Sequence, residues 1–74
     1  MNWNYRVLRN EHDDLIMIEC YYDRDRDVIE GYAEGIAVVG DSLDDLRETL
    51  ERMTEALDQP ILTLADVEGG HDKS

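Results

Sequence analysis

The stretch GDSLDDLRETLERMTEALDQP (residues 40–60) decides the fold class, because it carries the clearest helical pattern in the chain. Ser42 is a favoured N-cap residue, and the acids that follow it complement the positive end of a helix dipole. Apolar residues then recur at spacings of three and four, as on one helix face: Leu43, Leu46, Leu50, Met53 and Leu57. These features predict an amphipathic helix of about 16 residues that ends before Pro60.

Two segments before this helix have the pattern of β-strands. Apolar and polar side chains alternate in WNYRVLR (residues 3–9), and β-branched and aromatic side chains dominate LIMIECYY (residues 15–22). Turn-forming residues separate the two segments, so we expect a hairpin. The second strand should place four side chains on one side: Ile16, Ile18, Cys20 and Tyr22.

A third antiparallel strand is expected around residues 31–34, where Gly31 and Gly35 favour a bulge or bend. The apolar residues 36–39 that follow are expected to be buried. The helix then returns the chain across the sheet and lies on one of its faces, because such crossovers are right-handed.

A short final strand is expected in ILTL (residues 61–64), parallel to the first and third strands. The prediction is therefore one α+β domain over residues 1–66, with the order β-β-β-α-β. Residues 67–74 have no periodicity and contain two glycines, so they are expected to form a flexible tail.

The charge of the chain restricts its partners. The 74 residues carry 19 acids and 7 lysines and arginines, a net charge of −12, which disfavours nucleic acid and anionic membranes and favours a basic protein. Without a membrane-spanning run or a signal-peptide pattern, we expect a cytoplasmic protein. Cys20 stands alone in the sequence, so no intrachain disulfide is expected, and a buried inert thiol is the favoured interpretation.

The segment DRDRDVIEGYAE (residues 23–34) carries acids at the first, third, fifth and twelfth positions, as a calcium-binding EF-hand loop does: Asp23, Asp25, Asp27 and Glu34. Val28 occupies the sixth position, where the sharp turn requires glycine, and the flanking segments resemble strands rather than helices. Calcium binding is therefore the least favoured alternative. The sequence has no phosphate-binding loop, serine elbow or zinc motif, so we expect neither an enzyme nor a cofactor.

Two sets of side chains are candidates for binding a protein. One helix side is wholly acidic and faces away from the apolar stripe, and a basic partner could bind it: Asp44, Glu48, Glu51 and Glu55. The other set is aromatic and either fills the core or forms a contact surface on the sheet: Trp3, Tyr5, Tyr21, Tyr22 and Tyr32. An exposed aromatic face or edge strand would allow a homodimer, which we expect.

The stretch EGYAEGIAVVGDSLDDLRETLERMTEAL (residues 30–57) resembles the core of the HicB-like antitoxin family, through Gly31-Tyr32, the Gly40-Asp41-Ser42 turn and the helix. The resemblance implies a β-β-β-α-β fold that masks a small basic ribonuclease toxin. The family's proline-containing segment before the turn is replaced here by GIAVVG. DNA binding by a separate C-terminal domain is not carried over. The alternative to an antitoxin-like function is a homodimeric structural domain.

Overall fold

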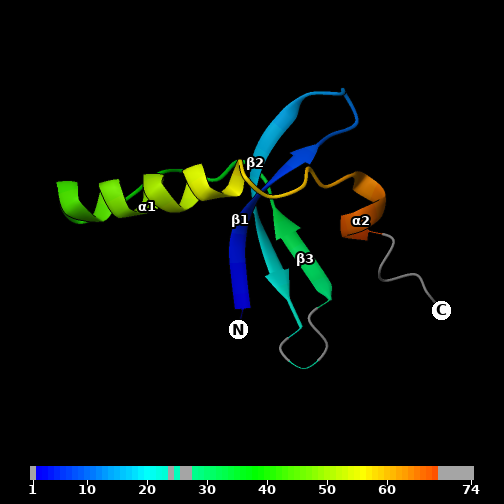
Figure 1. Cartoon of the computed structure of the whole chain (residues 1–74), viewed down its shortest axis with the longest axis horizontal. Coiled ribbons are helices and arrows are strands. Elements are labelled where there is room, and N and C mark those ends of the chain that lie inside the picture. The colour runs from blue at the N-terminus through cyan, green and yellow to red at the C-terminus, as the bar shows by residue number, and fades with distance from the viewer. Residues whose placement is uncertain (1, 24, 26–27, 69–74) are drawn as a thin grey trace.

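A computed structural model describes residues 2–23, 25 and 28–68. Three strands come first and two helices follow: β1 (Asn2–Arg9), β2 (Leu15–Tyr22), β3 (Ile29–Ala33), α1 (Leu43–Ala56) and α2 (Leu64–Glu68). The strands form an antiparallel sheet in the order β1-β2-β3, and Figure 1 shows the helices at its two sides. The α+β class and the three-stranded antiparallel sheet are as the sequence predicts.

The predicted hairpin joins β1 to β2. Leu8 pairs with Ile16 and Val7 with Met17, so the strand pattern sets the register. The turn is stabilised by the Asn10 Oδ1 atom, which accepts hydrogen bonds from the backbone N–H groups of His12 and Asp14 at 2.9 and 3.0 Å. A short polar side chain therefore satisfies the backbone where the ladder ends.

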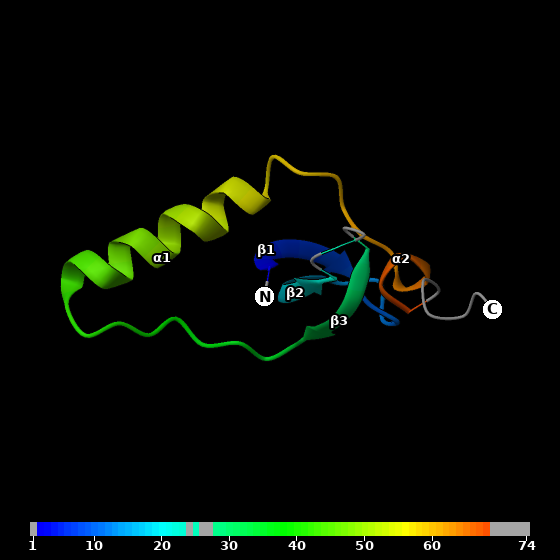
Figure 2. The same cartoon turned by 90° about the horizontal axis from the view of Figure 1, so that it is seen from below.

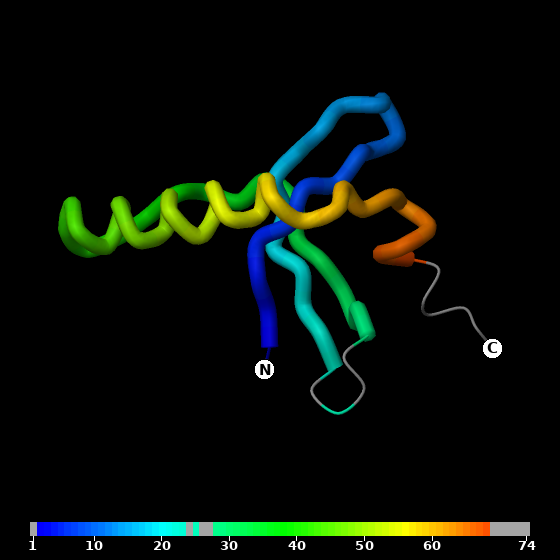
Figure 3. The backbone as a smooth tube through the Cα atoms, in the orientation of Figure 1, coloured from blue at the N-terminus to red at the C-terminus, as the bar shows by residue number. Residues whose placement is uncertain are grey.

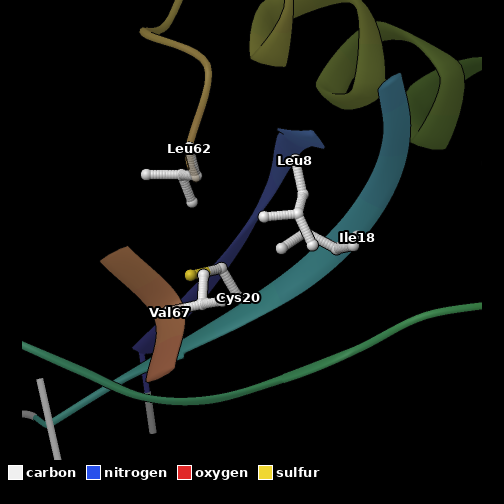
Figure 4. Close-up of a cluster of buried hydrophobic side chains, with 5 residues drawn as sticks. All are labelled: Leu8, Ile18, Cys20, Leu62 and Val67. Atoms are coloured by element: carbon white, nitrogen blue, oxygen red, sulfur yellow. The ribbon is translucent and has the colours of Figure 1, made fainter. Parts of the chain in front are cut away.

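The hydrophobic core lies on the sheet face that carries Ile18 and Cys20, two of the four side chains predicted to share one side of β2. Its buried side chains come from β1, β2, α2 and the chain before α2: Leu8, Ile18, Cys20, Leu62 and Val67. Figure 4 shows Val67 and Leu62 facing the side chains of the two strands. A helix of only five residues thus supplies part of the cover of this face, and the prediction of a buried Cys20 is confirmed.

The predicted final strand over residues 61–64 is not confirmed. Leu62 forms an isolated parallel bridge with Leu8, where the chain between the two helices passes β1 (Figure 3). A capping pair then starts α2: Thr63 Oγ1 accepts from Asp66 N–H at 3.2 Å, and Asp66 Oδ2 accepts from Thr63 N–H at 2.9 Å. Because this cap turns the chain into a helix, extended pairing stops after Leu62.

The C-terminal boundary also differs from the predicted one. The sequence places the start of the tail at residue 67, but Val67 is 2% exposed and packs in the core as part of α2. Residues 69–74, the rest of the predicted tail, lie outside the described residues.

Helix α1 does not lie across the sheet as predicted. It projects from the sheet and contacts β1 near its C-terminal end, where Ala56 is buried (Figure 2). The chain between β3 and α1 runs outward in an extended path and turns back at the start of the helix. Residues 36–39 were expected to be buried, but Val38 and Val39 are 42% and 71% exposed because this path leads away from the sheet.

Candidate protein-binding surface

The start of α1 is fixed by short-range contacts. Ser42 Oγ accepts a hydrogen bond from Asp45 N–H at 3.1 Å, and Asp45 Oδ2 accepts one from Asp41 N–H at 3.2 Å. These bonds satisfy backbone donors that have no partner inside the helix. The predicted N-cap is therefore confirmed. Because it fixes where α1 begins, it also fixes which side chains lie on each side of the helix.

The acidic side of α1 is exposed along the helix. It consists of the four predicted partner-binding residues, Asp44, Glu48, Glu51 and Glu55. Arg47 Nη1 donates to Asp44 Oδ1 at 2.9 Å, and among the described residues the three glutamates have no ion pair. Exposed pairs of this kind contribute little to stability, so the four carboxylates remain accessible to a cationic partner.

The apolar stripe of α1 is divided between half-buried and exposed positions. Leu46 and Met53 are half-buried, whereas the other three leucines, Leu43, Leu50 and Leu57, are 74%, 51% and 65% exposed. We name these three the leucine ladder. Residues seven apart lie almost directly above one another on an α-helix, so the ladder forms one apolar line along α1. The sequence predicts the apolar stripe, but it does not indicate that three of the leucines in the stripe are exposed.

A recess of 440 Å³ lies between the C-terminal half of α1 and the start of β1, lined by Trp3, Asn4, Tyr5, Arg52, Glu55, Ala56 and Gln59. The Trp3 and Tyr5 rings meet edge to face, with centroids 5.1 Å apart and planes at 82°. Glu55 belongs to both the acidic side and this recess. The aromatic residues that line the recess are candidates from the sequence. Arg52 and Gln59 are not, because they line it only as a result of where α1 lies in the structure.

Two of the remaining aromatic residues belong with the core. Tyr22 and Tyr32 pack against the core, and their hydroxyls donate to Asn4 Oδ1 at 2.9 Å and Glu68 Oε2 at 3.3 Å. Burial raises the pKa of Tyr22 above its ordinary value. The five aromatic residues therefore do not form one contact surface, since two of them complete the core.

The acidic segment between β2 and β3 is described only in part. Asp25 N–H donates to Asp23 Oδ1 at 2.8 Å, while Asp27 lies outside the described residues. Within the described part of the chain, no group of three or more His, Cys, Asp or Glu residues could hold a metal ion. The segments on both sides are strands, as the sequence predicts.

Comparisons with protein-family models, curated proteins and solved structures give no match. Neither helix in the described residues is long and apolar enough to cross a membrane.

Proposed function

We propose that this chain is an acidic protein-protein interaction domain that masks a basic protein. The observation that carries the proposal is the position of Glu55, which continues the acidic side of α1 into the recess beside Trp3 and Tyr5. A lysine or arginine side chain entering there would meet a carboxylate and aromatic rings together. Cation–aromatic contacts contribute about 0.5 to 2 kcal/mol, depending on how far they are desolvated.

The electrostatics of the whole chain support the same class of partner. A net charge of −12 attracts a basic protein over distance, and the acidic side of α1 offers it a continuous line of carboxylates. Arg52 lines the recess without an ion pair among the described residues, so a partner with one acid among its basic groups would fit best.

The resemblance to HicB-like antitoxins suggests a specific form of this function, in which the basic partner is a small ribonuclease toxin. A homodimeric structural domain with no other partner is the alternative. The antitoxin-like function requires the acidic side for an activity that can be measured in the cell, whereas the homodimeric structural domain does not.

Affinity capture from the source cell tests the proposal with two variants of equal charge. The first carries Glu48→Gln, Glu51→Gln and Glu55→Gln on the acidic side. The control carries Glu11→Gln, Glu30→Gln and Glu34→Gln, three exposed sites away from α1. We expect one basic protein to be retained by the wild type and the control, to be lost by the first variant, and to dissociate with added salt.

Equal capture by both variants would show that net charge alone recruits the protein, and the proposal would then fail. For the antitoxin-like form, the captured protein is expressed in a host. Wild-type chain should restore growth, whereas the acidic-side variant should not. Absence of growth inhibition by the captured protein would remove the antitoxin-like form.

A further inference from the structure

Half of the backbone groups of β1 point away from the sheet. Arg9 N–H and Val7 C=O bond to the backbone of Leu62 at 3.0 and 2.9 Å, on the side of β1 away from β2. Asn10 N–H instead donates across the hairpin to the carbonyl oxygen of Asp14 at 2.9 Å. Because the two directions alternate along an antiparallel strand, the even-numbered residues of β1 bond to β2 and the odd-numbered residues point outward.

The chain itself pairs with only part of this outer edge. The pairing ends at Leu62, because Pro60 has no N–H group and its carbonyl oxygen accepts from Arg6 Nη2 at 2.8 Å. Trp3 and Tyr5 are the remaining outward-pointing residues between Arg6 and the start of β1. Their outward N–H and C=O groups have no hydrogen-bond partner among the described residues. The first half of β1 therefore has an open edge.

The 440 Å³ recess lies at this open edge. Figure 1 shows α1 meeting β1 on the side away from β2. One wall of the recess is formed by Trp3, Asn4 and Tyr5, and the other by the end of α1 and the turn after it. Its volume is within the range of about 300 to 1,000 Å³ that is typical of ligand-binding sites. Space is thus left beside the strand edge that carries the free backbone groups.

We propose that the outer edge of β1 from Trp3 to Tyr5 binds an extended basic peptide segment, which adds a strand to the sheet beside α1. Exposed strand edges bind peptides in this way, with main-chain hydrogen bonds supplying affinity and side chains supplying specificity. The inference rests on the proposed function for the charge of the segment, and it describes how the basic partner is held.

The side chains around the edge select a basic segment. Tyr5 pairs with Glu19 across the ladder, so the Trp3 and Tyr5 rings share a sheet face with that carboxylate. Glu55 lines the recess from α1 and adds a second carboxylate. Side chains of an added strand alternate between the two faces, so a lysine or arginine at every second position would reach the rings and the acids.

The opposite edge of the sheet provides an internal comparison. Gly31 and Ala33 pair with β2 in positions that leave the backbone of Tyr32 pointing outward from β3. The β3 pairing is shorter than that of β1, and its register shifts between Tyr21 and Tyr22. Irregular pairing of this kind makes an edge a poorer template, so we expect the segment to bind β1 and not β3.

Amide hydrogen exchange of the full chain, followed by NMR, tests the proposal. The probe is an acetylated and amidated peptide of alternating threonine and lysine with four lysines, and the control is spermine, which has a similar charge and no peptide backbone. In the free protein, the amides of Trp3 and Tyr5 should exchange fast, while those of Asn4 and Arg6 should be protected by β2. We expect the peptide to slow exchange at Trp3 and Tyr5 about tenfold or more, and spermine to leave it unchanged.

Three results would overturn the proposal. They are unchanged exchange at Trp3 and Tyr5 with the peptide at saturating concentration, equal protection by spermine, and protection at Tyr32 in place of the two β1 residues. The measurement reports on backbone groups, so binding through side-chain charge alone does not produce the expected pattern.

A pair of variants at one position tests the backbone contact separately. Tyr5→Pro removes the outward N–H and the ring, whereas Tyr5→Ala removes the ring alone. Proline is tolerated in edge strands at positions whose N–H points away from the sheet, so the bonds of Asn4 and Arg6 to β2 should remain. In calorimetric titrations, Tyr5→Pro should bind the peptide about tenfold or more weakly than Tyr5→Ala, and equal affinities would contradict the proposal. The exchange experiment on the wild type does not depend on how well Tyr5→Pro folds.

Failure of this inference is distinguishable from failure of the proposed function. Protection of Trp3 and Tyr5 by the peptide, with no basic protein captured from the cell, would support the edge site and remove the proposed function. A captured basic protein that leaves the same two amides exchanging fast would support the function and overturn the edge site.

Discussion

Gly40 lies directly against Asp45 in the first turn of α1. A Cβ atom on Gly40 would lie 2.8 Å from Asp45 Cβ and 2.9 Å from the backbone nitrogen of Leu46. Because one of these atoms is helix backbone, it cannot move aside without disturbing the cap formed by Ser42.

Gly40→Ala should therefore destabilise the fold by about 1 to 3 kcal/mol, as overpacking does in well-packed regions. Gly31→Ala is the control, since nothing lies within 4 Å of its Cβ position. Urea unfolding followed by circular dichroism measures both. Equal stability of the two variants would mean that the chain before α1 does not pack as described.

Arg6 connects the sheet to the chain that follows α1. Its Nη2 atom donates to the carbonyl oxygen of Pro60 at 2.8 Å, and its Nη1 atom donates to Tyr22 Oη at 3.3 Å. Arg6→Ala should cost about 1 to 3 kcal/mol of unfolding free energy, because the part-buried hydrogen bond to Tyr22 and the exposed one to Pro60 both lose their charged donor. Arg9→Ala, which breaks an exposed pair with Asp13, should stay within about 0.5 kcal/mol. Equal losses in thermal melts would contradict the role assigned to Arg6.

Val67 in α2 is 2% exposed, close to the 0% of Leu8, Ile18 and Cys20 in the strands. Val67→Ala should destabilise the protein by about 1 to 3 kcal/mol, through lost burial and the cavity that remains. Ala65→Gly is a useful comparison in the same helix, since Ala65 is exposed and its change removes about 1 kcal/mol of helix propensity. If Val67→Ala cost less than Ala65→Gly in urea unfolding, α2 would not be part of the core.

The stability of the protein should decrease in alkali. Burial raises the pKa of the Cys20 thiol above its ordinary value, and a hydrogen bond with Tyr22 and the charge of Arg6 lower it by less. A raised pKa in the folded state gives stability that is fully present below the unfolded pKa, about 8.5 for cysteine, and is lost as pH rises through the folded pKa. As the pH rises above about 8.5, the urea midpoint of the wild type should therefore decrease. In Cys20→Ala the decrease should be less steep.

Tyr22 acts in the same direction, since its pKa is also raised by burial. Tyr22→Phe should likewise reduce the pH dependence, and the double variant should reduce it further. A wild-type midpoint that is constant from pH 8 to pH 11 would exclude both contributions.

The local elements were largely predictable because their causes are local. Side-chain alternation predicted β1 and β2, and Ser42 with its periodic leucines predicted α1. The capping pair Thr63-Asp66 is also present in the sequence, but the apolar residues in ILTL (residues 61–64) indicate a strand. A helix of five residues is too short for its periodicity to outweigh that pattern.

The sequence by itself determined the period of β1, β2 and α1, the separation of acids from leucines on α1, and the negative charge of the chain. Only the tertiary structure decided which apolar side chains are buried. Periodicity shows which side chains share one face of an element, but not which element packs against that face. Here Leu62 and Val67 pack on the sheet face where the sequence predicts α1. The extended chain before α1 carries the helix off the sheet, so Leu43, Leu50 and Leu57 remain exposed.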